Sequence, residues 1–153
     1  SPVCCAVALL DGLDHACIID GCRLGFGKHY KYRHNDMADL ENKIEAIAED
    51  RGVIIVVDGV FSMEGDLANL PRIVELKNRF GGRLMVDDAH GIGVFGSNGR
   101  GTAEHFGLEH GVDLGMGTLA KSLPTGRRLV VGVSALWATG ASRRGAWSRN
   151  AVL

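Results

Sequence analysis

Short apolar runs that end at a polar residue constrain the fold of this chain more than any other feature of its sequence. Val53–Val57 is rich in β-branched residues, Ala6–Leu10 is a similar run, and each is followed directly by an aspartate. Arg83–Val86 is a shorter run, and Val112–Met116 is a fourth candidate. Continuous apolar strands of this kind belong in sheets that are covered on both faces. The runs therefore predict the buried strands of a layered protein.

Helical patterns separate these runs. Asp36–Glu49 places its apolar residues on one face and its charged residues on the other. Pro71–Phe80 begins with a proline that suits a first helical turn, and it stops before a pair of glycines. Asp14–Leu24 is a weaker helical candidate, and Lys28–Arg33 predicts a short edge strand. The alternation predicts an α/β fold with three layers, αβα, around a mostly parallel sheet.

The composition is that of an ordinary globular protein. A chain of 153 residues is long enough for one domain with a core. The net charge of −1 gives no reason to expect nucleic acid or an anionic membrane as a partner. We expect no membrane span and no signal peptide, hence a cytoplasmic protein. The cysteines lack C-x-x-C spacing, so we expect buried thiols in a reducing compartment: Cys4, Cys5, Cys17 and Cys22.

Polar side chains follow each predicted strand. His15 comes after the first strand and Ser62 after the second. Asp87 and His90 close the third strand, and Lys121 follows the fourth. Ligands of open α/β sheets bind at the carboxyl ends of the strands. We therefore expect these side chains to meet at one edge of the sheet.

A glycine motif follows the third strand. Gly91–Gly96 matches the G-x-G-x-x-G pattern of dinucleotide sites, and Asp113 lies roughly twenty residues further on. The match is weak, because residues 87–90 separate the strand from the motif and loop-forming residues continue through Gly101. The sequence favours a glycine-rich turn around a buried site.

Other simple explanations exist for the polar residues. Asp87, Asp88 and His90 combine carboxylate with imidazole, a common set of metal ligands. No further cluster completes such a site, so we expect no metal, and Asp87 also suits the cap of the following turn. Ser62 is not in a nucleophile elbow, which argues against a hydrolase triad. A lone Lys121 would be an ordinary surface lysine, but its convergence with the others favours a functional site.

A pyridoxal 5′-phosphate (PLP) site needs the residue types that this edge collects. A lysine amine holds the cofactor as a Schiff base and later serves as a base. An acid opposite the pyridine nitrogen keeps the ring protonated, so that the ring can act as an electron sink. A flat side chain stacks on the ring, and hydrogen-bond donors hold its phenolic oxygen. The polar residues at this edge include these types, and Lys121 is the candidate attachment point.

Five stretches, taken in order, resemble the α-oxoamine synthase family of fold-type I PLP enzymes. The resemblance runs nearly continuously from Ala6 to Leu123 and implies part of the large domain of that fold. Family members condense an amino acid with an acyl-CoA and release CO₂, as homodimers. The stretches are DHACIIDG (14–21), HNDM (34–37), DGVFSMEGD (58–66), VDDAHG (86–91) and GTLAK (117–121).

The resemblance implies a role for each predicted site residue. Lys121 would be the Schiff-base lysine, His15 would stack on the pyridine ring, and Asp87 would pair with the ring nitrogen. These three residues and His90 form the expected catalytic set.

Two further cofactor contacts follow from the same resemblance. Ser62 would join His90 on the phenolic oxygen side, and Thr118 would lie by the phosphate. The implied partners are the amino acid, the acyl-CoA and a second copy of the chain.

The subfamily is indicated by two shorter stretches. GCRL (21–24) and GRGTAEHFG (99–107) are most similar to serine palmitoyltransferase-type members, which make sphingoid bases. GTL (117–119) is closer to the 2-amino-3-ketobutyrate CoA ligases, and 8-amino-7-oxononanoate synthase is a further alternative. An alternative of another class is a truncated, non-catalytic remnant that only binds PLP or a partner.

The last thirty residues depart from the family pattern. Residues 1–123 hold 12 basic and 18 acidic residues, whereas residues 124–153 hold five arginines and no acid. The family has a Gly-Gly pair after the lysine, where this chain has Arg127-Arg128. We expect a partial PLP-binding domain over 1–123 and a divergent basic tail over 124–153. An out-of-frame continuation is our hypothesis for the tail, and the chain would then be an inactive fragment.

Overall fold

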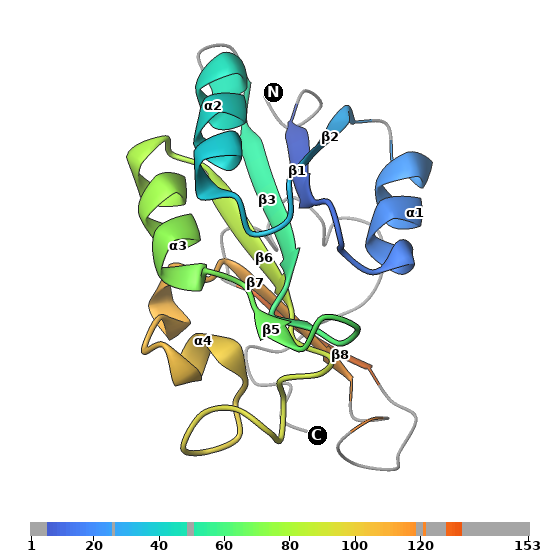
Figure 1. Ribbon diagram of the computed structural model, residues 1–153, viewed down its shortest axis with the longest axis vertical. Coiled ribbons are helices and arrows are strands. Elements are labelled where there is room, and N and C mark those ends of the chain that lie inside the picture. Colours follow the sequence, from blue (N-terminus) through green and yellow to red (C-terminus); the bar gives the residue numbers. More distant parts are fainter. Residues whose placement is uncertain (1–5, 26, 49–50, 119–120, 122–127, 133–153) are drawn as a thin grey trace.

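A six-stranded sheet with helices on both faces organises the chain (Figure 1). The computed structural model describes residues 6–25, 27–48, 51–118, 121 and 128–132. The strand order is β2-β1-β3-β6-β7-β8, and all neighbours pair in parallel except β7 and β8. The predicted, mostly parallel α/β sheet is confirmed. The strands are β1 (Val7–Asp11), β2 (His29–Tyr32), β3 (Val53–Asp58), β6 (Arg83–Asp87), β7 (Leu114–Thr118) and β8 (Arg128–Gly132).

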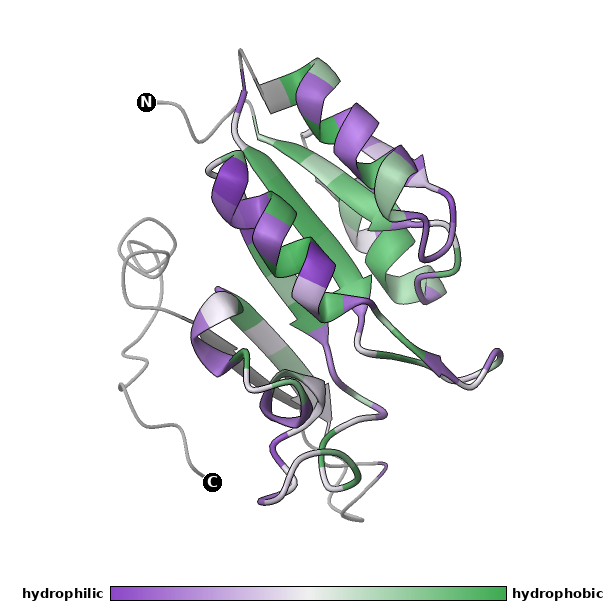
Figure 2. Cartoon of the chain, turned by 60° about the vertical axis from the view of Figure 1, so that its left-hand side comes forward, coloured by the Kyte–Doolittle hydropathy of each residue, from purple (hydrophilic) through white to green (hydrophobic). Residues whose placement is uncertain are grey.

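Three helices cover the sheet. The helices α2 (Met37–Ala48) and α3 (Leu70–Arg79) pack on one face, and α1 (Ala16–Leu24) packs on the other (Figure 1). Hydrophilic residues lie on the outward sides of α2 and α3, and hydrophobic strands lie behind them (Figure 2). A short α4 (Thr102–His105) and a 3-10 turn (Glu109–Gly111) follow β6.

The core sits mainly between the sheet and the α2–α3 layer. Leu9, Ile55 and Leu84, from three neighbouring strands, are fully buried there. Burying each such side chain contributes about 1.5–3 kcal/mol. A smaller cluster under α1 contains Leu10, Val56 and Ile18. Because side chains alternate along a strand, the aspartates that end β3 and β6 share the α1 face with this smaller cluster.

The hairpin of β4 (Val60–Phe61) and β5 (Asp66–Leu67) was not predicted from the sequence. Its strands have two residues each, which is too short to give a recognisable period-2 pattern. The strand expected at Val112–Met116 begins later, at Leu114, because Val112 follows the 3-10 turn directly.

Most of the predicted basic tail, and the boundary after residue 123, lie outside the described residues. Within residues 128–132 the backbone forms β8, which pairs with β7. Arg127, which stands where the family has the first glycine of its Gly-Gly pair, also lies outside the described part of the chain.

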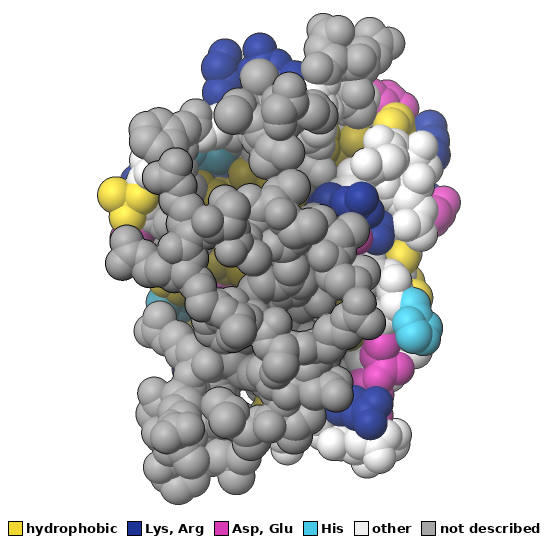
Figure 3. All heavy atoms as spheres, turned by 180° about the vertical axis from the view of Figure 1, so that it is seen from behind, with side chains coloured by type: hydrophobic (Ala, Val, Ile, Leu, Met, Phe, Trp, Pro, Cys, Tyr) yellow, Lys and Arg dark blue, Asp and Glu magenta, His cyan; other side chains and the backbone are white. Residues whose placement is uncertain are grey.

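The described surface carries mixed charge. Acidic and basic side chains alternate along the right-hand edge of the view from behind (Figure 3). Among the described residues, no helix has both the length and the apolar character needed to cross a membrane.

Candidate active site

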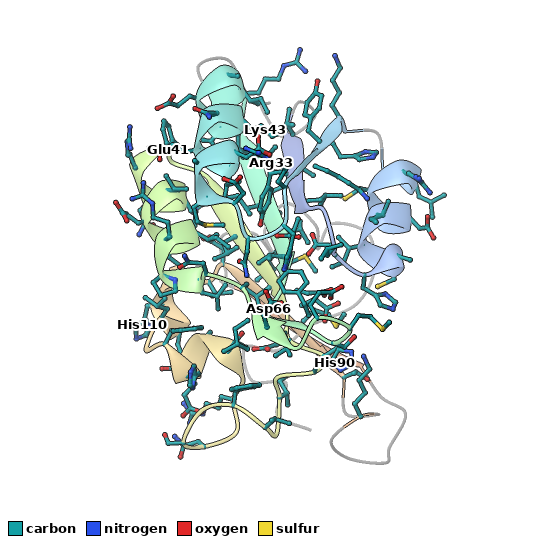
Figure 4. The ribbon with its side chains drawn as sticks, viewed as in Figure 1. Arg33, Glu41, Lys43, Asp66, His90 and His110 are labelled. Carbon is teal, nitrogen blue, oxygen red and sulfur yellow. The ribbon has the colours of Figure 1, made fainter. Side chains whose placement is uncertain are left out.

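The carboxyl ends of the parallel strands bring the predicted residues to one edge of the sheet. Asp58 and Asp87 end β3 and β6 and are register partners across that pair of strands. His90 lies in the loop after β6, at this same end of the sheet (Figure 4). Thr118 ends β7, and Lys121 follows it in the chain. The strand ends thus bring Asp87, His90 and Lys121 to the same edge of the sheet, as expected.

Lys121 and His90 are in direct contact. The Nζ atom of Lys121 lies 2.6 Å from Nε2 of His90. Burial lowers the pKa of His90, and the positive charge of Lys121 lowers it further. The imidazole is therefore neutral at neutral pH and accepts a hydrogen bond from the lysine. Since Lys121 is exposed, its amine is held in place while remaining open to a ligand.

Asp87 supplies a buried carboxylate beside this pair. Its exposed fraction is 4%, and its Oδ1 accepts the N–H of Ala89 at 3.0 Å, so the predicted turn cap is present. The carboxylate interacts electrostatically with His90 and with Asp58. A buried carboxylate is costly unless a donor or a cation faces it. This position therefore favours a cationic or N–H group of a ligand.

His15 caps the first turn of α1. Its Nδ1 accepts the backbone N–H of Cys17 at 3.2 Å and lies 3.0 Å from the Cys17 Sγ. Its own backbone N–H donates to Oδ2 of Asp58 at 2.9 Å. Because Nδ1 is an acceptor, the neutral ring carries its proton on Nε2. The residue is exposed, so its ring remains available for stacking.

Ser62 and Thr118 complete the predicted set. Ser62 is exposed in the loop between β4 and β5, which follows the carboxyl end of β3. Thr118 is buried at the end of β7. Both therefore lie at the strand-end side of the sheet, as the sequence predicts.

Two carboxylates that we did not single out as site residues support this edge. Asp14 accepts the backbone N–H groups of Asp11 at 2.8 Å and of Asp58 at 2.9 Å, and so joins the ends of β1 and β3. Burial raises the pKa of Asp58 to about 6, the hydrogen bond from His15 opposes this, and the charge of Asp87 adds to it. For Asp58, the available signal was that three neighbouring strands, β1, β3 and β6, all end in aspartate.

Asp14 gives a testable pH dependence of stability. Burial raises its pKa from 3.8 to about 8, although the N–H of Asp58 lowers it. The folded protein thus holds a proton that the unfolded chain releases, so this group makes the free energy of unfolding fall as the pH rises from 3.8 to about 8. We expect a flatter profile for Asp14→Asn in urea denaturation across this range. Parallel profiles for the two proteins would contradict the assignment, and Asp20→Asn, at an exposed position, is the control.

The glycine motif surrounds a carboxylate of the protein itself. Asp88 accepts the backbone N–H of Thr102 at 2.6 Å, and a Cβ on Gly91 would lie 1.9 Å from its Oδ1. Asp113, the acid of the dinucleotide alternative, instead accepts from Lys77 at 2.9 Å at the opposite end of β6. The predicted glycine-rich turn is present, but what it surrounds is the protein's own Asp88.

The metal alternative and the cysteine prediction have different outcomes. Within the described ranges, no three His, Cys, Asp or Glu side chains are grouped to hold a metal ion.

The prediction of buried thiols is wrong for Cys17, which is exposed in the first turn of α1. Cys22 is partly buried against the smaller core cluster. Cys4 and Cys5 lie outside the described residues.

Known proteins resemble this chain closely in sequence. Residues 5–129 match the family described as Aminotransferase class I and II. The serine palmitoyltransferase of Bacteroides ovatus is 59% identical over 115 residues, which are 75% of this chain and 29% of that protein. The 8-amino-7-oxononanoate synthase of Thermosipho melanesiensis is 53% identical over 114 residues, which are 74% of this chain and 29% of that protein.

Solved structures give the same relationship. The serine palmitoyltransferase of S. paucimobilis, solved with PLP and myriocin bound, has a TM-score of 0.80 and 37% identity over 83% of this chain and 32% of that chain. This chain spans 29% of the length of both curated relatives. The family match nevertheless covers most of its residues, including every predicted site residue. The chain belongs to the class I and II aminotransferase family, and within it to the α-oxoamine synthases.

Proposed function

We propose that this chain provides the PLP-binding core of an acyltransferase that condenses an amino acid with an acyl-CoA and releases CO₂. The contact between Lys121 and His90, beside the buried carboxylate of Asp87, carries the proposal. Serine palmitoyltransferase activity, which makes sphingoid bases, is the first candidate because relatives of that name reach 59% identity. The 53% identity to an 8-amino-7-oxononanoate synthase supports that activity as the second candidate.

The residues present fit PLP. Schiff-base formation with the aldehyde of PLP requires an accessible amine, and the exposed Lys121 provides one. The buried Asp87 suits a protonated pyridine nitrogen, and the exposed ring of His15 suits stacking on a flat heterocycle. His90 and Ser62 would contact the phenolic oxygen.

The phosphate end of the cofactor would lie near Thr118. This threonine ends β7, three residues before the proposed attachment lysine.

Each side chain then has a defined task. PLP, when bound, withdraws electrons from the attached amino acid and so acidifies its α-carbon. The amine of Lys121 would accept the α-proton on Nζ. The neutral His90 accepts a hydrogen bond from Nζ and so orients that atom. The carboxylate of Asp87 would face the pyridine nitrogen and favour its protonated form.

The test supplies the purified protein with PLP, L-serine and palmitoyl-CoA, and measures free CoA thiol and CO₂. Equal release of both products supports the first candidate. Equal release only with other amino acids or shorter acyl-CoA thioesters favours 8-amino-7-oxononanoate synthase activity. Release of CoA thiol without CO₂, from glycine and acetyl-CoA, favours 2-amino-3-ketobutyrate CoA ligase activity, because its four-carbon product retains the carboxyl group of glycine. PLP binding without any release favours a non-catalytic remnant that binds only the cofactor or a partner.

We also propose that the protein is a homodimer, because family members build their sites across two subunits. A cytoplasmic location is a separate proposal. The domain division at residue 123 remains our proposal as well. The change from a net charge of −6 to +5 across this position supports it.

A further inference from the structure

The β4–β5 hairpin, which carries Ser62, stands outside the main sheet. Its turn is closed by the N–H of Gly65, which donates to the carbonyl of Phe61 at 2.7 Å. An isolated two-stranded hairpin is marginally stable at best in water. The position of Ser62 therefore depends on what holds this hairpin to the rest of the protein.

His34 links the hairpin to the end of β1. Its Nδ1 lies 2.9 Å from Oδ1 of Asp11, and its Nε2 lies 2.9 Å from Oδ2 of Asp66 in β5. Ionised carboxylates only accept hydrogen bonds, so both ring nitrogens donate and the imidazole carries a positive charge. The ring also packs edge-on against Phe61, with centroids 4.5 Å apart.

Asn35 reinforces the same link. Its backbone N–H donates to Oδ2 of Asp11 at 2.9 Å, and its side-chain amide donates to the carbonyl of Leu67 at 2.9 Å. The residue has a φ of 51°, which asparagine adopts more readily than most residues. Residues 34 and 35 thus bind both the sheet end and the second strand of the hairpin.

We propose that His34 is a positioning residue: its charged ring holds the β4–β5 hairpin, and with it Ser62, at the cofactor edge of the sheet. The importance of Ser62 rests on the proposed function, whereas the anchoring of the hairpin does not. The link is sheltered on the β1 side, where the side chain of Asp11 is 1% exposed, and more open at the hairpin, where that of Asp66 is 44% exposed.

The charges around His34 give the anchor a pH dependence. Asp11 faces the ring from β1 and Asp66 faces it from β5, while Asp14 and the Tyr32 hydroxyl interact with Asp11. Burial lowers the pKa of His34, but its hydrogen bonds to the two aspartates outweigh this and hold the pKa above 6.5. The anchor is therefore complete below pH 6.5 and is lost as the pH rises through the raised pKa.

Hydrogen exchange tests the anchor directly. In His34→Gln we expect the protection factors of the Gly65 and Ala68 amides to fall about 10- to 100-fold, which is the range for one charge-assisted hydrogen bond. The dissociation constant of PLP should rise in parallel, while the Lys121 adduct still forms. His110→Gln, at an exposed position in the 3-10 turn, should change neither quantity (Figure 4).

A second variant covers the case in which His34→Gln does not fold. Asp66 is 44% exposed, and Asp66→Asn removes only its charge. The pKa of His34, followed by NMR, should then fall toward its ordinary value, with a smaller loss of protection.

Each outcome decides a separate point. Unchanged protection factors in both variants would overturn the anchor. Lost protection with unchanged PLP affinity would overturn the link to Ser62. A wild-type protein without any Lys121 adduct would refute the proposed function, and the exchange data would still decide the anchor.

Discussion

The Lys121→Ala variant is expected to lose the covalent attachment of PLP completely. After PLP addition, borohydride reduction and peptide mapping, the wild-type protein should carry a phosphopyridoxyl group on Lys121 alone. The reason is local, because Lys121 is an exposed residue and its Nζ atom is oriented by a neutral imidazole 2.6 Å away. Scattered labelling of several lysines in the wild type would contradict the assignment.

The same variant should lose turnover by at least about 10²–10⁴-fold, the range for removing a general base. Its thermal stability should stay within about 0.5 kcal/mol of the wild type, since the side chain is exposed. Lys31→Ala, at an exposed position in β2, is the matched control and should leave both labelling and turnover unchanged. A full loss of turnover in this control would point to a general folding defect.

Asp87→Asn should produce the second-largest effect. The amide keeps the size of the side chain and its contact to Ala89, but it removes the negative charge from the end of β6. We expect turnover to fall about 10²–10³-fold, as for other losses of a preorganised charge or donor in an active site. PLP affinity should fall about 10- to 100-fold, which the visible absorbance of the bound cofactor reports in a titration.

The neighbouring Asp88 offers a matched control, because the same substitution there removes a carboxylate that binds the protein itself. Its carboxylate accepts the N–H and the hydroxyl of Thr102, at 2.6 and 3.0 Å, and takes part in the glycine-rich turn. Asp88→Asn should therefore change the stability of the fold while leaving PLP affinity close to that of the wild type. Equal losses of affinity in the two variants would show that neither aspartate has a specific role.

The sequence predicts the sheet and its functional edge because both follow from local patterns. Runs such as Val53–Val57 are long enough to identify, and parallel strands send the residues after them to one side. The β4–β5 hairpin has no such pattern, since its strands have two residues each. The roles of Asp58 and His34 depend on contacts between segments remote in sequence, such as the pairing of His34 with Asp66. No spacing rule in a single sequence encodes such contacts.

The cysteine prediction failed for a related reason. Spacing argued against a paired C-x-x-C metal site, but it could not tell which side of α1 each thiol would occupy. Cys17 lies in the first turn beside the capping His15, and this end of the helix faces solvent. Five residues later, Cys22 returns to the side that packs on the sheet.

The order of the strands also bears on how the protein folds. β1 pairs with β3 and β3 with β6, so each contact along the centre of the sheet joins segments separated by a helix. Such non-local pairings close large loops and form slowly. Residues as distant as His15, Asp58, Asp87 and Lys121 meet only after these pairings are complete. The proposed cofactor site is therefore complete only after these strands have paired, and PLP that binds there would stabilise the folded protein.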